Sequence, residues 1–213
     1  MKNWYRLFSV KPNSETLTYH PTKIYSFIIF DTETTCTGKH AEISQLSAIN
    51  ESNLAIFSKY ILPASNVSSR ATRVNKLSVK NINGKRQLLK ENQPVETVSL
   101  DEALQEFLTF LDSSHHKEFY RVLLGHNSST FDTPILLRNS DANFHRRLKD
   151  LNVYFVDSLI LVKDLLKEKH PALQLTSGQL CKSNQSSLFS HLFNENFEAH
   201  DALEDVVVHQ NYF

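Results

Sequence analysis

Four carboxylates and one histidine, spread over three short segments, have the chemistry needed for metal-assisted hydrolysis of a phosphodiester. The segments are FDTETT at 30–35, GHNSSTFD at 125–132 and HDALED at 200–205, and they supply Asp31, Glu33, Asp132, His200 and Asp205. Carboxylate oxygens are ligands of the kind that Mg2+ and Mn2+ prefer, and two such cations about 3.5 to 4 Å apart stabilise both the attacking and the leaving oxygen. Histidine, with a reference pKa of about 6.5, can take a proton from water near neutral pH.

Each segment on its own also has an ordinary structural explanation. Asp31 and Glu33 fit two turn acids that face water, and Asp132 fits a first-turn acid stabilised by a helix dipole. His200 fits a surface histidine in a chain that has 10 of them. The joint pattern favours chemistry, because four acids from three segments and one base are the components of a two-metal site. We therefore predict that the four carboxylates bind two divalent cations, Mg2+ or Mn2+, and that His200 is the general base.

The sequence before residue 63 predicts three strands. Residues 24–30, IYSFIIF, are a nearly unbroken apolar run, which is typical of a central strand covered on both faces and which ends at Asp31. In extended backbone Asp31 and Glu33 point to the same side. Residues 41–49 and 54–62 predict two further strands joined by a polar turn, so the first three strands should form an antiparallel meander.

After residue 100, helices and strands alternate. The sequence predicts a helix at 101–111, a strand at 120–125, a strand at 153–157 followed by a helix at 158–168, a short helix around 175–182 and a final helix from about 201. Thr133 and Pro134 suit the N-cap and first position of one more helix, with Asp132 at its opening. These elements predict an α/β fold with a mixed sheet flanked by helices.

The start of the final helix resembles a capping box. Asp201 would be the N-cap residue and Glu204 the third helical residue, which leaves His200 just outside the helix. Asp205 would then lie about one turn inside the helix and be held rigidly. We therefore expect a base whose side chain can swing beside a fixed ligand.

Residues 63–92 form a basic and weakly patterned segment, with a short helix expected around 71–80. The segment has a single acid, Glu91, against seven cations: Arg70, Arg73, Lys76, Lys80, Lys85, Arg86 and Lys90. A local nucleic-acid-binding patch and a solvated loop both fit this composition. The formal net charge of zero argues against a protein that coats nucleic acid through bulk electrostatics.

The bulk composition indicates an ordinary globular protein. A chain of 213 residues with 40% hydrophobic content can bury one substantial core, and we expect an N-terminal extension at 1–22 followed by one domain at 23–213. We expect no membrane span, since no stretch approaches about 20 apolar residues. The opening residues lack the features of a secretory signal, and the two cysteines suggest no disulfide framework, so we expect an intracellular location, cytoplasmic or nuclear.

The three segments resemble the three motifs of the DEDDh group of 3′-5′ exonucleases, over about residues 24–210. The resemblance implies an RNase H-like fold, with three antiparallel strands and then two parallel strands in a five-stranded sheet. It also implies hydrolysis at the 3′ ends of single-stranded nucleic acid, with DNA as the expected polymer and nucleoside 5′-monophosphates as products. By this correspondence the metal ligands are Asp31, Glu33, Asp132 and Asp205, and the histidine that deprotonates water is His200.

Within that group, GHNSSTFDTPILLRN and LSAIN most resemble the three-prime repair exonuclease-like branch, including the exonuclease-like domain of long promyelocytic leukaemia protein isoforms. The resemblance implies that Thr34, Thr35 and Asn127 seat the terminal nucleotide and that Leu77 is a wedge against the base. The alternatives are ordinary turn residues and, for Leu77, helix packing. Two features depart from that branch: Lys76 stands where relatives often have glycine, and a proline-rich insertion is absent, so no partner that docks on it is inferred.

Two other functions remain open at this point. RNA 3′-end trimming is one, because telling RNA from DNA requires a contact with the 2′-OH that no sequence feature reports. A catalytically inactive interaction module is the other, since a fold alone does not establish activity. The predicted partners are therefore single-stranded DNA or RNA 3′ ends, and protein partners are not legible from the sequence.

Overall fold

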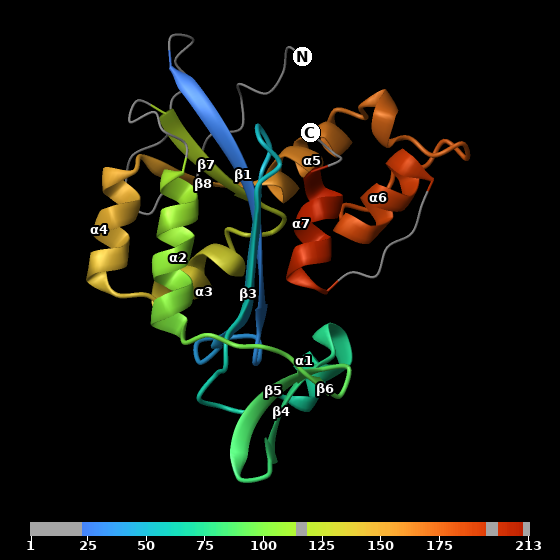
Figure 1. Ribbon diagram of the computed structural model, residues 1–213. Helices are drawn as coiled ribbons and strands as arrows, with labels where there is room; N and C mark the ends of the chain where they lie inside the picture. The colour runs from blue at the N-terminus through green and yellow to red at the C-terminus, as the bar shows by residue number, and fades with distance from the viewer. Residues whose placement is uncertain (1–22, 114–118, 195–199, 211–213) are drawn as a thin grey trace.

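The fold is a five-stranded mixed sheet with helices on both faces (Figure 1). It is seen in a computed structural model that describes residues 23–113, 119–194 and 200–210, so the predicted extension at 1–22 lies outside the described residues. The strand order is β3-β2-β1-β7-β8, in which β1, β2 and β3 are antiparallel neighbours and β7 and β8 run parallel to β1. The strands are β1 (Ile24–Thr34), β2 (Ile43–Asn50), β3 (Ile56–Tyr60), β7 (Phe119–Gly125) and β8 (Val153–Asp157). The predicted fold class is confirmed.

Strand β1 is central because it is apolar on both sides. Ile28 and Phe30 belong to the core on one face, and Ile29 belongs to the core on the other. This alternation continues past the apolar run, so Asp31 and Glu33 follow Ile29 in pointing to one face, and Thr32 follows Phe30 to the opposite face. The strand therefore sends its two acids to one side of the sheet.

Two groups of helices cover the two faces (Figure 1). Helices α2 (Leu100–Asp112), α3 (Asp132–Arg138) and α4 (Ala142–Asp150) pack on the face that holds Phe30. Helices α5 (Ser158–Lys167), α6 (Gln185–Phe193) and α7 (Ala202–Gln210) lie on the other side. Helix α7 packs on β1 and β2, with Val206 in the same apolar cluster as Ile29 and Ile49. Both sides of the sheet are thus buried by elements from widely separated parts of the chain.

The basic segment folds into a small unit beside the main sheet, at the bottom of Figure 1. It contains α1 (Ser69–Asn75) and a three-stranded antiparallel sheet of β4 (Leu77–Ile82), β5 (Lys85–Lys90) and β6 (Gln93–Pro94). The prediction of a helix over 71–80 was wrong after Asn75, because Lys76 adopts a left-handed φ of 61° and ends α1. Asn83 and Gly84, with φ of 52° and 77°, form the two-residue turn between β4 and β5. Asn-Gly between two strands is a strong hairpin signal, and it could have predicted this sheet.

Two further helices differ from the prediction. The helix expected around 175–182 is absent; that stretch follows a short 3-10 helix at Pro171–Leu173 and contains Gly178 at a φ of 79°. The helix in this region is α6, which begins after Asn184 because its side chain accepts a hydrogen bond from the Ser187 N–H. Helix α4 was not predicted.

Helix α3 starts two residues earlier than an N-cap at Thr133 and a first helical residue at Pro134 would place it. Its first residue is Asp132, and the Thr133 N–H donates to the Ser128 carbonyl oxygen at 2.9 Å. The loop carbonyl therefore satisfies the N–H of Thr133 inside the helix, so Thr133 is not the N-cap. Asp132 lies at the opening of the helix, as predicted. In the described parts of the chain, no helix has both the length and the apolar character needed to cross a membrane.

Candidate active site

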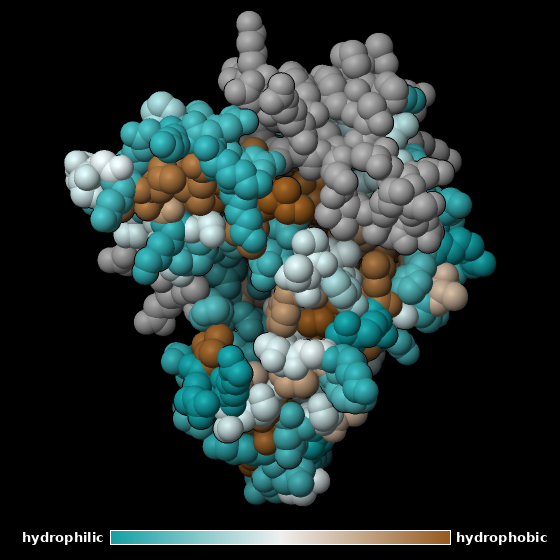
Figure 2. Space-filling model, turned by 180° about the vertical axis from the view of Figure 1, so that it is seen from behind, coloured by the Kyte–Doolittle hydropathy of each residue, from teal (hydrophilic) through white to brown (hydrophobic). Residues whose placement is uncertain are grey.

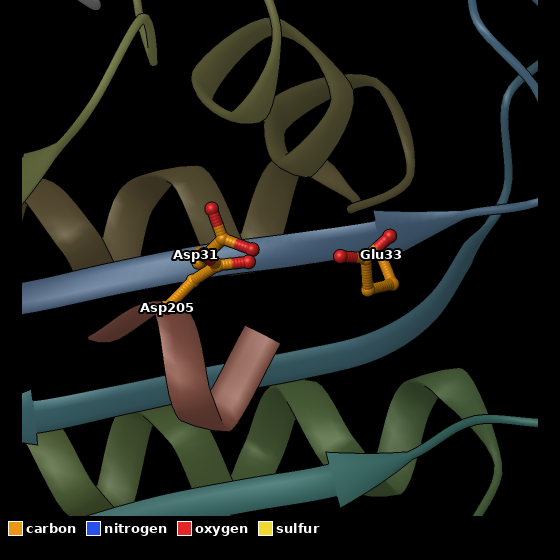
Figure 3. Close-up of side chains that lie close together, drawn as sticks. All are labelled: Asp31, Glu33 and Asp205. Carbon is orange, nitrogen blue, oxygen red and sulfur yellow. The ribbon is translucent and has the colours of Figure 1, made fainter. Parts of the chain in front are cut away.

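Three of the predicted carboxylates meet at the carboxyl end of β1. Asp31 and Glu33 come from β1, and Asp205 approaches them from α7 (Figure 3). Carboxylate oxygens of these three residues lie within 4.8 Å of one another. The meeting follows from the alternation of β1, which turns both acids toward the face that α7 covers.

Asp132 reaches the same pocket from the start of α3. Its Oδ1 accepts hydrogen bonds from the backbone N–H of Thr32 at 3.0 Å and from the Thr32 hydroxyl at 2.6 Å. Thr32 stands between Asp31 and Glu33 in the sequence, so these two bonds hold the Asp132 carboxylate next to the end of β1, in the same pocket as the two β1 acids. The structure therefore brings together all four predicted carboxylates. Thr32 was missed by the sequence analysis, although it lies between the two acids of the first motif.

These carboxylates are costly to ionise where they lie. Burial, followed by the negative charges of Asp132 and Asp205, raises the pKa of Asp31 well above its usual value. Burial is also the main cause that raises the pKa of Glu33 to about 8, that of Asp205 to about 7 and that of Asp132 to about 6. Buried acids that repel one another in this way are stabilised when a cation neutralises them. The donor set, made of carboxylate oxygens, fits a hard divalent cation.

His200 lies immediately before the N-cap of α7, as predicted. Asp201 is that N-cap, and its Oδ1 accepts from the N–H groups of Leu203 at 2.9 Å and Glu204 at 3.3 Å. The reciprocal contact differs from the expected capping box: the His200 N–H donates to Asp205 Oδ2 at 2.8 Å. This bond fixes the backbone of His200 at a left-handed φ of 81° and orients the Asp205 carboxylate.

The side chain of His200 is exposed and lines the pocket. Desolvation of the ring, followed by the positive charge of Lys76, lowers the pKa of His200 below its usual value. A histidine with a lowered pKa is neutral at neutral pH and can accept a proton. The geometry and the charge state of His200 are therefore those of a base at the edge of the acid cluster.

Asp201 has a second set of contacts that the sequence did not reveal. Its Oδ2 accepts from Lys90 Nζ at 2.6 Å and from the Tyr60 hydroxyl at 3.3 Å, and its Oδ1 accepts from Gln45 Nε2 at 3.3 Å. Burial would raise the pKa of Asp201, but the hydrogen bond and charge of Lys90 help to hold it below its usual value. The N-terminus of α7 is thereby tied to β2, β3 and β5.

Asn127 lines the pocket in the loop between β7 and α3, at a left-handed φ of 63°. Asp157, at the end of β8, holds this loop: its Oδ1 accepts from the Asn127 N–H at 2.8 Å and its Oδ2 from the Ser129 N–H at 3.1 Å. Sequence analysis missed Asp157, whose position at the end of a parallel strand was the available signal. Asn127 therefore has a fixed backbone beside the acids.

The other residues expected to contact a nucleotide divide into two groups. Thr34 lines the pocket. Thr35 is buried outside the pocket lining, and its hydroxyl accepts from the Glu42 N–H at 3.1 Å. Leu77 is also not brought to the pocket, because it is 0% exposed in β4; the apolar residue of this region that lines the pocket is Val74 of α1, 43% exposed.

Asn75 is a further pocket residue that sequence analysis missed. It is buried, its side chain hydrogen-bonds with Glu33, and its Nδ2 donates to the Thr34 carbonyl oxygen at 3.2 Å. Its Oδ1 accepts from the Leu77 N–H at 3.0 Å. Asn75 thus fixes α1 against the end of β1 and orients Glu33.

The pocket around these residues has a volume of about 610 Å³ and is bounded by five parts of the chain. They are the end of β1, helix α1, the loop before α3, the start of α6 and the segment before α7. Figure 2 shows a recess between the helices at the upper left and the mainly hydrophilic lower lobe. Four acids and a histidine around a recess large enough for a nucleotide, on an RNase H-like fold, have the composition that phosphodiester hydrolysis requires.

Comparison with known proteins agrees with this class. Residues 28–212 match the exonuclease family of the RNase T type, and the chain belongs to this family. The family and the fold agree with the resemblance of the sequence to DEDDh-type exonucleases of the RNase H-like superfamily. The comparisons do not test the narrower placement in the three-prime repair branch, which stays a prediction.

Individual relatives support the same assignment. An uncharacterized exonuclease of Acanthamoeba polyphaga mimivirus is 32% identical over 84 residues, which cover 39% of this chain and 22% of that protein. The structure of the zinc-bound complex of E. coli exonuclease I with single-stranded DNA matches 88% of this chain with a TM-score of 0.67 and 16% identity. E. coli exonuclease I in complex with a dA16 oligonucleotide matches 86% with a TM-score of 0.63 and 17% identity. The chain spans 39% of exonuclease I in both comparisons, and the likeness at this identity concerns the fold.

Proposed function

We propose that this protein is a metal-dependent 3′-5′ exonuclease that removes nucleotides from the 3′ ends of single-stranded DNA and releases nucleoside 5′-monophosphates. The observation that supports the proposal most directly is the acid cluster of Asp31, Glu33 and Asp205, with Asp132 and His200 lining the same pocket. Family membership gives the reaction class. The dependence on metal, the 3′-5′ direction of degradation and the choice of DNA as substrate are the parts that we propose.

In this proposal Asp31, Glu33, Asp132 and Asp205 hold two divalent cations, Mg2+ or Mn2+. Bound there, the cations would neutralise the carboxylates and offset the charge that develops on the phosphate. His200 accepts a proton from the water that attacks phosphorus, and the bond from phosphorus to the 3′ oxygen of the preceding nucleotide breaks. Two backbone-anchored contacts, Thr32 to Asp132 and the His200 N–H to Asp205, keep the ligands oriented before any cation arrives.

The shape and charge of the pocket support a single-stranded end. A terminal nucleotide must be unstacked to enter a recess of about 610 Å³, and a frayed or single-stranded end is unstacked at the lowest cost. We propose that Thr34 and Asn127 contact that nucleotide and that Val74 packs against its base. Arg70 also lines the pocket, where it can contact a phosphate. The solved complexes of exonuclease I with single-stranded DNA favour DNA over RNA as the first polymer to test.

Nucleotide release from labelled oligonucleotides tests the proposal. Single-stranded DNA, single-stranded RNA and duplex DNA, each labelled at the 3′ end or at the 5′ end, would be incubated with Mg2+ or Mn2+. We expect mononucleotide from 3′-labelled single-stranded DNA, a shortening ladder from the 5′-labelled strand, and loss of both signals on chelation. Asp31→Asn is the matched control, and equal nucleotide release by both proteins would refute the proposal that this protein is an exonuclease. Faster release from RNA would reassign the polymer.

We also propose an intracellular location and a single exonuclease domain at 23–213. Cys36 and Cys181 are both free thiols, which suits a reducing compartment. The family match over residues 28–212 supports the domain boundary. Whether the compartment is cytoplasm or nucleus is a matter for localisation of the tagged protein.

A further inference from the structure

The carboxylate of Asp201 has no part in the proposed reaction, yet it is held by more groups than any of the metal-binding acids in the described structure. Its Oδ1 accepts from the N–H groups of Leu203 and Glu204 and from Gln45 Nε2. Its Oδ2 accepts from Lys90 Nζ and from the Tyr60 hydroxyl. The side chains of Asp201 and Lys90 are only 15% and 21% exposed. A partly buried ion pair of this kind is screened less than an exposed one, so its loss is felt more strongly.

The two oxygens of Asp201 have separable tasks. Oδ1 caps α7, and the amide oxygen of asparagine can cap a helix equally well. Oδ2 forms the ion pair with Lys90, which requires the negative charge. Asp201→Asn therefore keeps the cap and removes the ion pair. This separation allows the ion pair to be tested without unwinding the first turn of the helix.

Lys90 belongs to the small unit that forms one wall of the pocket. It is paired with Leu77 in the β4–β5 ladder, and the next residue, Glu91, donates its N–H to the Lys76 carbonyl oxygen at 3.0 Å. Lys76 in turn ends α1, whose residues line the pocket. The ion pair thus connects the pocket wall made by α1 to the first turn of α7.

The other end of the ion pair is one residue from the proposed base. His200 directly precedes Asp201, and its backbone is held at a φ of 81° by its N–H bond to Asp205. Asp201 fixes the next residue along the chain, so the segment from 200 to 205 is anchored at the base itself and immediately after it. A shift of this segment would displace both His200 and Asp205 from the acids of β1.

We propose that Asp201 is a positioning residue whose ion pair with Lys90 fixes the start of α7, so that His200 and Asp205 hold their places relative to Asp31 and Glu33. The inference rests on the proposed exonuclease function. It assigns to Lys90, one of the seven cations of the basic segment, a contact inside the protein rather than with nucleic acid. Loss of the pair would lower the rate of the chemical step and leave substrate binding nearly unchanged.

Steady-state kinetics on 3′-labelled single-stranded DNA with saturating Mg2+ would test this. Lys90→Gln and Asp201→Asn should each lower kcat by about 10- to 100-fold, the effect seen when groups that orient metal ligands are removed, with KM little changed. Lys90→Arg should restore the pair and most of kcat. The double variant Lys90→Gln with Asp201→Asn should be no slower than either single variant, because both remove one interaction. Lys59→Gln is the matched control, since it breaks the Lys59–Glu106 pair of 2.7 Å on the far side of β3, where the side chains are 34% and 42% exposed.

Amide hydrogen exchange in the metal-free protein provides a readout that does not depend on activity. The amides of Leu203 and Glu204 should exchange faster in Lys90→Gln than in the wild-type protein, and equally fast in Lys59→Gln and wild type. Unchanged kcat and unchanged exchange in Lys90→Gln would overturn the proposal. A raised KM with wild-type kcat would also overturn it, because Lys90 would then bind substrate. Failure of the wild-type protein to release nucleotides would instead refute the proposed function, while the exchange experiment would still report on the ion pair.

Discussion

Replacing Glu33 by glutamine should make the metal-free protein more stable at pH 8 and abolish its activity. Glu33 is buried beside Asp31 and Asp205, and burial is the main cause that raises its pKa from 4.5 to about 8. The folded protein therefore retains a proton on Glu33 at pH values where the unfolded chain has lost it. The free energy of unfolding then falls as the pH rises through that interval.

The size of the effect follows from the two pKa values. Below pH 4.5 Glu33 is protonated in both the folded and the unfolded protein, so its raised pKa does not lower the free energy of unfolding. At pH 5 the cost is about 1 kcal/mol, and at pH 8 it reaches about 4 kcal/mol, at 1.36 kcal/mol for each pKa unit. Glutamine has nearly the same shape and no charge, so Glu33→Gln should recover most of this energy. For a domain of this size, that corresponds to a rise in Tm on the order of 10 °C at pH 8.

Thermal unfolding in the presence of a chelator, at pH 5 and pH 8, measures the difference. Glu51→Gln is the matched control, because Glu51 is an exposed turn residue and its variant should follow the wild type at both pH values. Adding excess Mg2+ should reverse the order at pH 8, since a cation stabilises the wild-type carboxylates and binds less well to the variant. A Glu33→Gln protein that is no more stable than wild type at pH 8 without metal would refute the account of the acid cluster.

Four further predictions concern His200, Lys76, His209 and Arg73. In the pH profile of kcat, the fall on the acid side should lie below pH 6.5, because desolvation and the charge of Lys76 lower the pKa of His200. His200→Ala should remove this acid-side fall together with most of the rate. Lys76→Gly should stabilise the protein by about 0.5 to 1 kcal/mol in urea unfolding, because glycine tolerates the left-handed φ of 61° better than lysine. Burial lowers the pKa of His209 to about 3, so below pH 6.5 the unfolded chain binds a proton that the folded protein does not. Compared with His209→Gln, the wild type should lose about 2 kcal/mol of stability between pH 6.5 and pH 4.5. Arg73→Glu on the exposed surface of α1 should weaken DNA binding and flatten its dependence on salt, and unchanged affinity at low salt would return this residue to the status of a solvated side chain.

The sequence predicted the parts of the molecule that depend on local pattern. An apolar run followed by Asp31, Thr32 and Glu33 is enough to place two acids on one face of a buried strand, because side chains alternate along any strand. The start of α7 was predicted for a similar reason, since a capping residue acts on the N–H groups two and three positions ahead. These local rules placed four of the predicted site residues before any tertiary contact was known.

The contacts that complete the site depend on residues far apart in the chain. Nothing around Lys90 marks it as the partner of Asp201, because the pair exists only after β5 and the start of α7, which are far apart in the chain, come together in the fold. Leu77 illustrates the same limit: its motif suggested a helix and a contact with the base, whereas the left-handed conformation of Lys76 turns the chain and buries Leu77 in β4. Tertiary packing decided which apolar residue, Val74 or Leu77, faces the pocket.

The placement of Asp205 on α7 has a consequence for biosynthesis. A ribosome makes β1, with Asp31 and Glu33, long before it makes α7, and Asp205 joins them only when α7 docks on β1 and β2. The emerging chain therefore has two of the clustered acids without the third, and without His200. The proposed active site is therefore incomplete until α7 has been translated and has docked, so the proposed nuclease cannot cleave nucleic acid before that point.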